Sequence, residues 1–472
     1  MNNPTPLFRV LAIFALTALT ACTSHPPGER EERQSAITAG KPYEQPADKR
    51  DIPPLPDHPT PDDLLRYALL TNADVERQYW QWRAAIEQIP IDGTQPTGLA
   101  LTLSTTLNNG AFALDRTIVM AANDPMTDIA FPAKLSTAAR RSLENARAAG
   151  LRFRKAQFEL RRKVLTAYDD YALTAELIRL GEKNIQLLQI TATTTESLNR
   201  SGLSAQQDVL KSHNELDLAG NDLGHLRSQL PIHRAALNAL LNRPPDAVIA
   251  IPDSLPPNRP VANSDQEILD LAAKQNPELL SLSDEIRAKH EDIHLAKLQY
   301  YPDFDLAAST DLQGITQTLL GEFTIPIVRY EALRAAVAQA EANLRATEAT
   351  RRQTSSDLTA QLIDDIATLR DADRQLDLLE QTILPRAAEI VTLSRTAYQT
   401  GSSSLLDFLD AQRSLIDLQR LTATLQIARD KRLAEIESID ARNLEAPNAQ
   451  QALMRYPRLV SSIPPSYQKR RR

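Results

Sequence analysis

Alternating apolar and polar positions predict two short β-hairpins in this chain of 472 residues. Leucines occupy one face of residues 99–107, and alanine, threonine and serine occupy the other. A period of two is the pattern of a β-strand. Residues 303–309 repeat this alternation, and a glycine-containing loop and a second short apolar run follow each strand. We therefore expect one hairpin within 98–132 and another within 303–326.

Longer apolar periodicities predict helices of unusual length. Lys134–Arg200 contains no proline and carries apolar or small residues at a period of seven, which is typical of coiled coils. Such a helix is on the order of 100 Å long. Val328–Thr400 is a matching segment, and a return helix follows each long helix. We therefore expect two helical hairpins, at 134–241 and 328–436.

Two prolines should disturb these hairpins. Pro231 lies inside the first return helix, and Pro385 lies inside the second long helix. A proline has no N–H and clashes with the preceding turn, so each should kink its helix or break it locally.

A glycine-serine turn separates the two arms of each helical hairpin. Gly401 can adopt the left-handed conformation that ends a helix, and Ser403 or Ser404 can cap the next one. Gly202 repeats this punctuation, and Asp208 follows it at the spacing by which Asp407 follows Gly401. The chain is therefore an internal duplication, in which each copy has a helix, a β-hairpin and a helical hairpin. The two repeats are 61–260 and 261–441.

The N-terminal residues have the features of an export signal. Residues 1–21 place Arg9 before an apolar run that is too short to span a bilayer. Cys22, the only cysteine, follows Leu-Thr-Ala and resembles the lipid-bearing cysteine of a bacterial lipobox. The alternative is a free thiol behind an ordinary signal peptide. A lipid on Cys22 would anchor the mature N-terminus to a membrane.

Proline and charged residues dominate the segment after Cys22, so we expect an extended linker over residues 22–60. Residues 442–472 are expected to be a disordered tail.

Composition narrows the classes of function. The net charge is −7 and basic residues alternate with acidic ones, which argues against binding to nucleic acid. No segment after the signal peptide is apolar enough for a membrane helix, so a membrane could be crossed only by strands. Four strands are too few to close a transmembrane barrel, whereas three chains would supply twelve. The predicted fold is mainly helical with a small β part.

The second turn carries a specific motif, Tyr398-x-x-Gly401-x-x-x-x-Leu406-Asp407-x-Leu409-Asp410-Ala411. With the element order over Pro61–Ala441 and the lipobox, the chain resembles the TolC-like outer-membrane efflux factors, and most of all their lipoprotein branch. The resemblance implies a homotrimer with a twelve-stranded barrel in the outer membrane and a helical tunnel, the α-barrel, in the periplasm. It also implies a periplasmic adaptor and an inner-membrane pump as partners, and no cofactor.

The same resemblance assigns roles at the hairpin tips. It implies that Asp407 and Asp410 form two rings of carboxylates at the periplasmic aperture, which would favour cations. It places a polar link that holds the aperture closed on Tyr398 and Asp208. An arginine that supports this link in the family corresponds to Ser403 here. The alternative for the two aspartates is a solvated helix face near a cap.

One motif points to a different chemistry. His290-Glu291-Asp292-Ile293-His294 matches the H-E-x-x-H pattern of zinc metalloproteases. Catalytic zinc usually needs a third protein ligand, and no downstream motif supplies one. The first repeat has no histidine at the matching positions. We expect no metal site and no enzyme.

The sequence thus favours an outer-membrane lipoprotein channel that conducts passively, as the exit duct of a tripartite efflux or secretion system. A periplasmic coiled-coil lipoprotein without a barrel, structural or adaptor in role, is the main alternative. The side chains of Leu99, Leu101 and Leu103 should face lipid only in the channel. The sequence does not specify the cargo, because such a duct contacts it loosely and the pump selects it.

Overall fold

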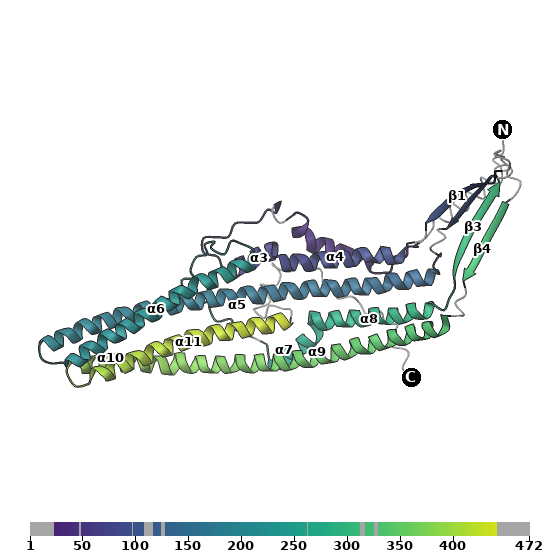
Figure 1. The fold of residues 1–472 in the computed structure, drawn as a ribbon. Coiled ribbons are helices and arrows are strands. Elements are labelled where there is room, and N and C mark those ends of the chain that lie inside the picture. The colour runs from purple at the N-terminus through teal and green to yellow at the C-terminus, as the bar shows by residue number, and fades with distance from the viewer. Residues whose placement is uncertain are drawn as a thin grey trace.

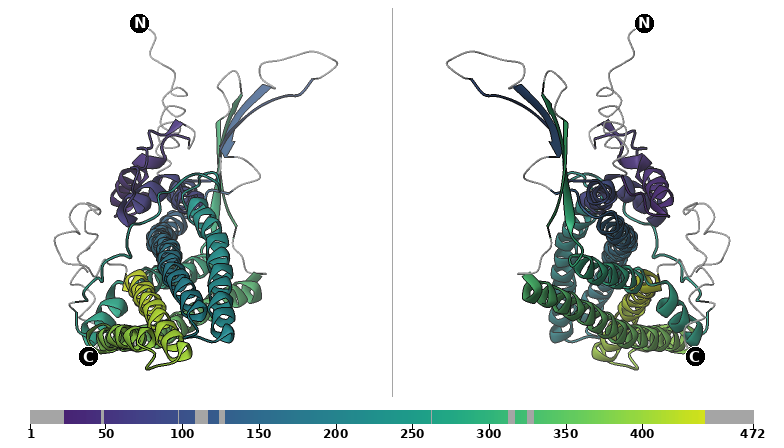
Figure 2. Two further views of the ribbon diagram at one scale, coloured as in Figure 1. Left: turned by 90° about the vertical axis from the view of Figure 1, so that its left-hand side faces the viewer. Right: turned by 90° about the vertical axis from the view of Figure 1, so that its right-hand side faces the viewer.

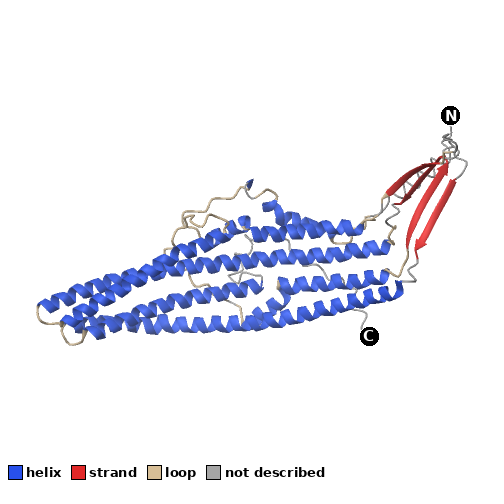
Figure 3. Cartoon of the chain, viewed as in Figure 1, coloured by secondary structure: helices blue, strands red, loops and turns tan. Residues whose placement is uncertain are grey.

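The structure is a computed structural model that describes residues 23–46, 49–96, 98–107, 117–123, 128–261, 263–311, 317–324 and 329–440. Long helices form one body, and a small sheet projects from one end of it (Figures 1 and 3). In chain order the elements are α2 (Glu29–Gly40), η1 (Lys41–Tyr43), α3 (Pro61–Thr71), α4 (Ala73–Gly93), β1 (Leu99–Thr105), β2 (Thr117–Asn123), α5 (Pro132–Arg200), α6 (Gln206–Leu240), α7 (Asp265–Gln275), α8 (Pro277–Leu298), β3 (Asp303–Asp311), β4 (Gln317–Thr324), α9 (Tyr330–Leu378), η5 (Leu379–Ile383), α10 (Leu384–Gln399) and α11 (Leu405–Asp440).

The first helix of each repeat is broken by an asparagine, although the sequence pattern suggested one continuous helix. Asn72 Oδ1 accepts hydrogen bonds from the backbone N–H groups at the start of α4, and Asn276 Oδ1 does the same at the start of α8. Each Nδ2 donates to the end of the return helix in its own repeat, Asn72 to Leu240 O (3.0 Å) and Asn276 to Ile439 O (2.9 Å). This matching pair of contacts confirms the duplication.

The long helices largely follow the prediction. Helix α5 runs unbroken from Pro132 to Arg200. Its counterpart is interrupted near Pro385, where α9 gives way to η5, a short π-helix, before α10 begins. The break expected at Pro231 is absent, because α6 continues as an α-helix through that residue. Packing of α6 along α5 holds the helix together despite the missing hydrogen bond.

The four strands form one antiparallel sheet in the order β1-β2-β3-β4. Its two hairpins come from different repeats, and they meet where β2 pairs with β3, as at Met120 opposite Ser309. Leu101 and Leu103 are each 69% exposed. Neither β1 nor β4 pairs with another strand along its outer edge within the described residues. The sheet is therefore open at both sides.

The extended linker predicted for residues 22–60 is wrong in its first half. Helix α2 and the turn η1 pack against the first repeat, where Trp82 Nε1 donates to Glu32 Oε1 (2.7 Å). Tyr43 is 3% exposed and lies edge-on to Phe153, with a ring-centroid distance of 6.4 Å. The sequence did not predict this packing, because proline and charged residues greatly outnumber the few apolar residues that make these contacts.

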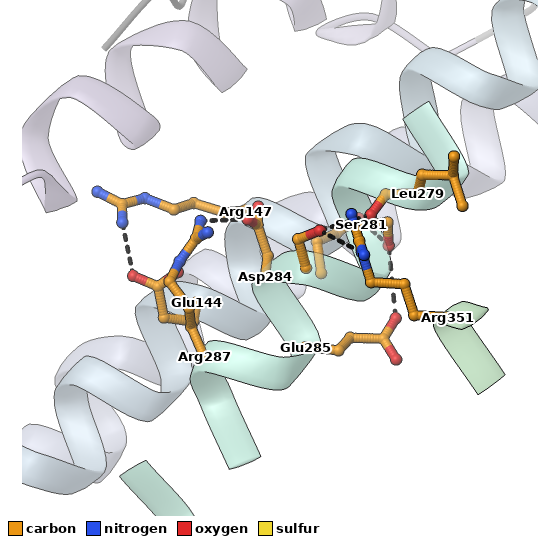
Figure 4. A network of polar contacts seen from close by, with 10 residues as sticks. Glu144, Arg147, Leu279, Ser281, Asp284, Glu285, Arg287 and Arg351 are labelled. Carbon is orange, nitrogen blue, oxygen red and sulfur yellow. Dashed lines mark hydrogen bonds and ion pairs between the residues drawn. The ribbon is translucent and has the colours of Figure 1, made fainter. Parts of the chain in front are cut away.

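Polar contacts join the repeats at mid-length of α8 (Figure 4). Arg287 Nε donates to Glu144 Oε2 of α5 (2.6 Å) and also pairs with the buried Asp284. Burial raises the pKa of Asp284 to about 6. Ser283 accepts from Arg351 Nε of α9 (3.0 Å) and donates to Leu279 O. Thus α8 is bonded to a helix on each side.

The segment between the repeats is tied to both of them. We call residues 244–261 the strap. Its carbonyl oxygens accept hydrogen bonds from four side chains: Tyr171 and Arg179 of α5 bond Ile249 and Pro252, and Gln426 and Arg429 of α11 bond Pro256 and Arg259. Seen end-on, the helices of the two repeats make a bent layer, and the strap connects them (Figure 2).

Asp169 of α5 is buried beneath this crossing, at 5% exposure. Burial and, after it, the nearby Asp430 carboxylate raise its pKa to about 8, although Arg259 and Lys431 oppose the shift. Asp430 also has a raised pKa, mainly because it is buried. Asp169 is therefore largely protonated in the folded protein at neutral pH.

Asp169→Asn should stabilise the protein increasingly as the pH rises. Because the pKa of Asp169 is raised on folding from an ordinary 3.8 to about 8, its contribution to stability is complete below about pH 4 and is lost as the pH passes through about 8. The melting temperature of the variant relative to wild type should therefore climb between about pH 4 and about pH 8 and level off above that range. Asp170→Asn, which removes an ion pair with Lys431, is the control and should show no such climb. A constant difference for Asp169→Asn would contradict this assignment.

Candidate functional site

The free ends of the two helical hairpins hold most of the residues that the sequence singled out (Figure 1). Gly202 and Gly401 have φ values of 80° and 75°, so the expected left-handed conformation is present at both. Leu203 N–H donates to Leu198 O (2.9 Å), and Ser402 N–H donates to Ala397 O (2.8 Å). The two turns thus close their helices with the same backbone bonding.

Asp407 completes a capping box at the start of α11. Its N–H donates to Ser404 Oγ (3.2 Å), while Ser404 N–H donates to Asp407 Oδ2 (3.1 Å). Hydrogen bonds from Ser404 and then from Ser403 lower the pKa of this carboxyl. Asp407 therefore stays ionised to lower pH than an ordinary aspartate.

Asp410 lies one turn further along α11 and is more than half exposed. Its Oδ1 is 3.8 Å from Arg413 Nη1. Asp407 is exposed as well. Both carboxylates are thus accessible at the hairpin end, as an aperture requires, while the bonding of Asp407 also fits the helix-cap alternative. Their role at an aperture stays a prediction.

Tyr398 has a different partner from the one predicted. Its hydroxyl is 3.0 Å from Thr195 Oγ1 of α5, and its ring stacks on Phe408. Asp208 instead accepts from Ser204 Oγ (3.2 Å). Within the described part of one chain, no hydrogen bond joins Tyr398 to Asp208. The physical reason is that Tyr398 is buried in an apolar cluster between α5, α10 and α11.

Two further contacts fasten the second hairpin onto the first. Gln412 Nε2 donates to Asn184 Oδ1 (3.2 Å), and Arg413 Nη2 donates to Glu215 Oε1 (2.6 Å). Together with Thr195–Tyr398, we call these three pairs the latch. Sequence reasoning missed them, because nothing in the spacing along one helix shows which side chains of another helix face it.

The zinc-protease motif lies on α8, and its glutamate is already engaged. Glu291 Oε2 accepts from Arg140 Nε (3.3 Å) and Nη2 (3.2 Å). His290 and His294 are exposed. Among the described residues, no group of three or more histidine, cysteine, aspartate or glutamate side chains could hold a metal ion.

Cys22 lies outside the described residues, but the two residues directly after it contact the end of α4. Ser24 N–H donates to Gly93 O (2.9 Å), and Thr94 Oγ1 lies 3.3 Å from Thr23 Oγ1. Gly93 ends α4, a few residues before β1 begins. Residue 23 therefore lies near the base of the sheet.

Aromatic side chains gather where the helices meet the strands. Phe131 stacks on Tyr301 with a ring-centroid distance of 5.6 Å, and Tyr300 lies 5.9 Å from Tyr330. Among the helices that the structure describes, none has the length and apolar character needed to cross a membrane.

Comparison with known proteins gives the family to which this architecture is similar. Residues 268–442 match the family model described as "Outer membrane efflux protein". The chain is 22% identical over 287 residues to the cation efflux system protein CusC of Escherichia coli O6:H1, which covers 58% of this chain and 57% of that protein. It is 24% identical over 284 residues to the toluene efflux pump outer membrane protein TtgI of Pseudomonas putida, covering 57% of this chain and 59% of TtgI. The aligned region thus spans little more than half of these curated relatives.

The fold match is more extensive than the sequence match. The outer membrane protein VceC of Vibrio cholerae superposes with a TM-score of 0.69 at 18% identity, over 82% of this chain and 97% of that one. The predicted fold of long helical hairpins with a small β part is confirmed.

A matched pair of glycine variants tests the turn. An added Cβ meets no atom within 4 Å at Gly401 or at Gly220 of α6, so only the backbone conformation differs. Gly401→Ala should destabilise the protein by about 1–2 kcal/mol, because alanine disfavours the left-handed region. Gly220→Ala should stabilise it by roughly 0.5–1 kcal/mol, because alanine is the better helix former. Melting temperatures that move in the same direction for both variants would contradict this account of the turn.

Proposed function

We propose that this chain, whose residues 268–442 match the outer-membrane efflux protein family, is one subunit of a trimeric outer-membrane channel. The observation that carries the proposal is the open four-stranded sheet at one end of the long helical hairpins. An open edge leaves backbone N–H and C=O groups without partners, and these cannot remain unpaired in lipid. Pairing β4 of one subunit with β1 of the next would close a barrel of twelve strands from three chains.

The surface of the sheet supports insertion into a membrane. Leu101 and Leu103 of β1 and Phe323 of β4 are at least two-thirds exposed in the single chain. Such side chains favour contact with lipid, and the aromatic pairs at the base of the sheet are typical of a membrane interface. Lipid on Cys22 would add an anchor at the same end, since residue 23 is held beside Gly93. A periplasmic scaffold without a barrel would leave these leucines exposed to water, which is unfavourable.

The helical hairpins extend away from the sheet, and in this proposal they form the periplasmic tunnel. The tunnel ends at the hairpin tips, where Asp407 and Asp410 of three subunits would form two rings of negative charge. Carboxylate rings attract cations and repel anions in a pore. A direct link between Tyr398 and Asp208 belongs to this proposal only between subunits.

Transport through such a duct is passive and needs no catalytic group or cofactor in this chain. An inner-membrane pump and a periplasmic adaptor would supply the energy and deliver the cargo. The relatives named for cation and toluene efflux serve chemically different substrates. We infer that the exit duct is the shared component and that selectivity for cargo lies in the pump.

Conductance in a planar bilayer tests the channel and its aperture together. Purified wild-type protein should give small, cation-selective openings, and Asp407→Asn/Asp410→Asn should reduce the selectivity or enlarge the openings, because the charge rings are lost. Asp371→Asn, at an exposed position of α9 remote from the tips, is the control and should behave as wild type. Failure of the purified protein to insert into the bilayer, or its isolation as a soluble monomer, would contradict the proposal.

Weakening the latch should favour the open aperture. Thr195→Val keeps the shape of the side chain but leaves the buried Tyr398 hydroxyl without its partner, at a cost of about 1–3 kcal/mol to the closed state. A cost of about 1–3 kcal/mol corresponds to roughly a 5- to 150-fold rise in the ratio of open to closed channels. Arg413→Ala should act in the same direction with a smaller effect, because its ion pair is partly exposed.

Single-channel recordings measure this ratio directly. Arg374→Ala removes an exposed ion pair with Asp371 and serves as the control. If Thr195→Val and Arg374→Ala open equally often, the latch does not hold the closed state.

A further inference from the structure

A cluster of buried charges lies where the strap crosses α5 and α11. Arg259 of the strap pairs with Glu437 of α11 (Nη1 to Oε2, 3.2 Å), and Arg161 of α5 reaches the same carboxylate oxygen (3.4 Å). Glu437 is 1% exposed. These contacts join the strap, the first repeat and the second repeat at one point.

Arg429 extends the cluster to a third helix. Its Nε donates to Asp373 Oδ1 of α9 (2.5 Å), its Nη1 to Asp430 Oδ1 (2.9 Å) and its Nη2 to the carbonyl oxygen of Arg259 (2.8 Å). One guanidinium group therefore connects α9, α11 and the strap. Lys431 and Asp170 form a neighbouring pair between α11 and α5.

We call this cluster the joint. Its charged members are Arg161 and Asp170 of α5, Arg259 of the strap, Asp373 of α9, and Arg429, Asp430, Lys431 and Glu437 of α11; the largely protonated Asp169 of α5 lies among them. Removing one partner of a buried ion pair leaves an uncompensated charge, which is strongly destabilising. The helices are therefore held firmly together at this level.

The regular backbone hydrogen bonding of the helices is disturbed beside the joint in both hairpins, although α6 remains α-helical at Pro231. Apart from Pro132 at the first position of α5, Pro231 and Pro385 are the only prolines in the helices of the two hairpins. In the second repeat, η5 and Pro385 follow Asp373 on the side of the hairpin tip. A π-helical turn and a proline both interrupt the regular hydrogen-bond ladder, and kinks concentrate at such places.

The position of Pro231 relative to the joint follows from its neighbours on α6. Arg227 pairs with Glu182 of α5 (2.6 Å), which lies on the tip side of the joint. His233 lines an open groove of about 300 Å³ together with Asp170, which belongs to the joint. Pro231 lies between these two positions on α6. Each hairpin thus has one proline position that is level with the joint or lies a short distance from it towards the hairpin tip.

We propose that the joint is the fixed point of the gate, on which both hairpins bend at Pro231 and at η5 with Pro385 while the helices towards the sheet stay together. This inference rests on the proposed channel function, because it assigns the moving and the stationary parts of that gate. Buried ion pairs resist separation, whereas a helix bends more easily at a proline or at a π-helical turn, where its regular backbone hydrogen bonding is disturbed. A force at the tips therefore bends the hairpins and leaves the joint intact.

Distances between spin labels test the proposal in the assembled protein. Labels at Leu203→Cys and Leu406→Cys, which are exposed positions on the two tips, report on tip separation. Labels at Ile91→Cys and Ile363→Cys, exposed on α4 and α9, report on the region towards the sheet. A Cys22→Ser background removes the only native cysteine, and dilution with unlabelled subunits isolates distances within one chain.

Arg259→Gln should at least double the width of the tip distribution and leave the pair nearer the sheet unchanged. Arg374→Gln, at an exposed ion pair outside the joint, is the matched control and should alter neither. Equal broadening of both pairs would overturn the proposal, because it would show a general loss of structure rather than a released pivot.

Pro231→Ala/Pro385→Ala provides a second test that leaves every charge in place. Restoring two backbone N–H groups should stiffen the hairpins and narrow the tip distribution, and an unchanged width would also overturn the proposal. These distances do not depend on ion flow. A joint that behaves as expected in a protein that fails to conduct would separate this inference from the proposed function.

Discussion

Backbone hydrogen bonding at the two outer strands is the constraint on which the rest of the structure depends. The described parts of β1 and β4 have no partner along their outer edges, and Leu101 and Leu103 of β1 are largely exposed. A sheet in this condition is unstable alone in water or in lipid. The helices share this incompleteness: Ile363 of α9 and Leu393 of α10 are 53% and 62% exposed. The strands and the helices of the single chain thus both expose apolar side chains, as the proposed trimer requires.

The duplication explains how one sequence produces such a segment. In both repeats an asparagine ends the first helix, caps the second and donates to the end of the return helix. This set of bonds fixes the helical layer of each repeat. The strands then join the repeats through the pairing of β2 with β3, and the strap joins them again at mid-length of the helices. Together with the Arg287–Glu144 contact and the latch, these connections keep the repeats in one orientation.

Much of this architecture could be predicted from the sequence, since it depends on local patterns. The period of two in β1, the period of seven in α5 and the left-handed glycines of the turns each act over a few neighbouring residues. The predictions failed where distant elements meet. The sequence indicated a linker where α2 packs, because the burial of Tyr43 depends on a surface that Tyr79 and Phe153 supply from far along the chain. Within one chain, Tyr398 contacts Thr195 and not the predicted Asp208, because its partner depends on how α10 is rotated against α5.

The contacts of the latch are weaker than those of the joint, and this difference predicts which of them breaks first. The Arg413–Glu215 pair of the latch is partly exposed and contributes about 0–1 kcal/mol. The Tyr398–Thr195 bond is buried, and its loss costs about 1–3 kcal/mol. Breaking a buried ion pair such as Arg259–Glu437 by removing one partner costs about 3–5 kcal/mol. In the proposed channel, a pull at the tips would therefore release the latch before it disturbs the joint, and opening would stop at the middle of the helices. The proposed gate would then move at one end of the chain without disturbing the sheet, which in the same proposal stays closed in lipid at the other end.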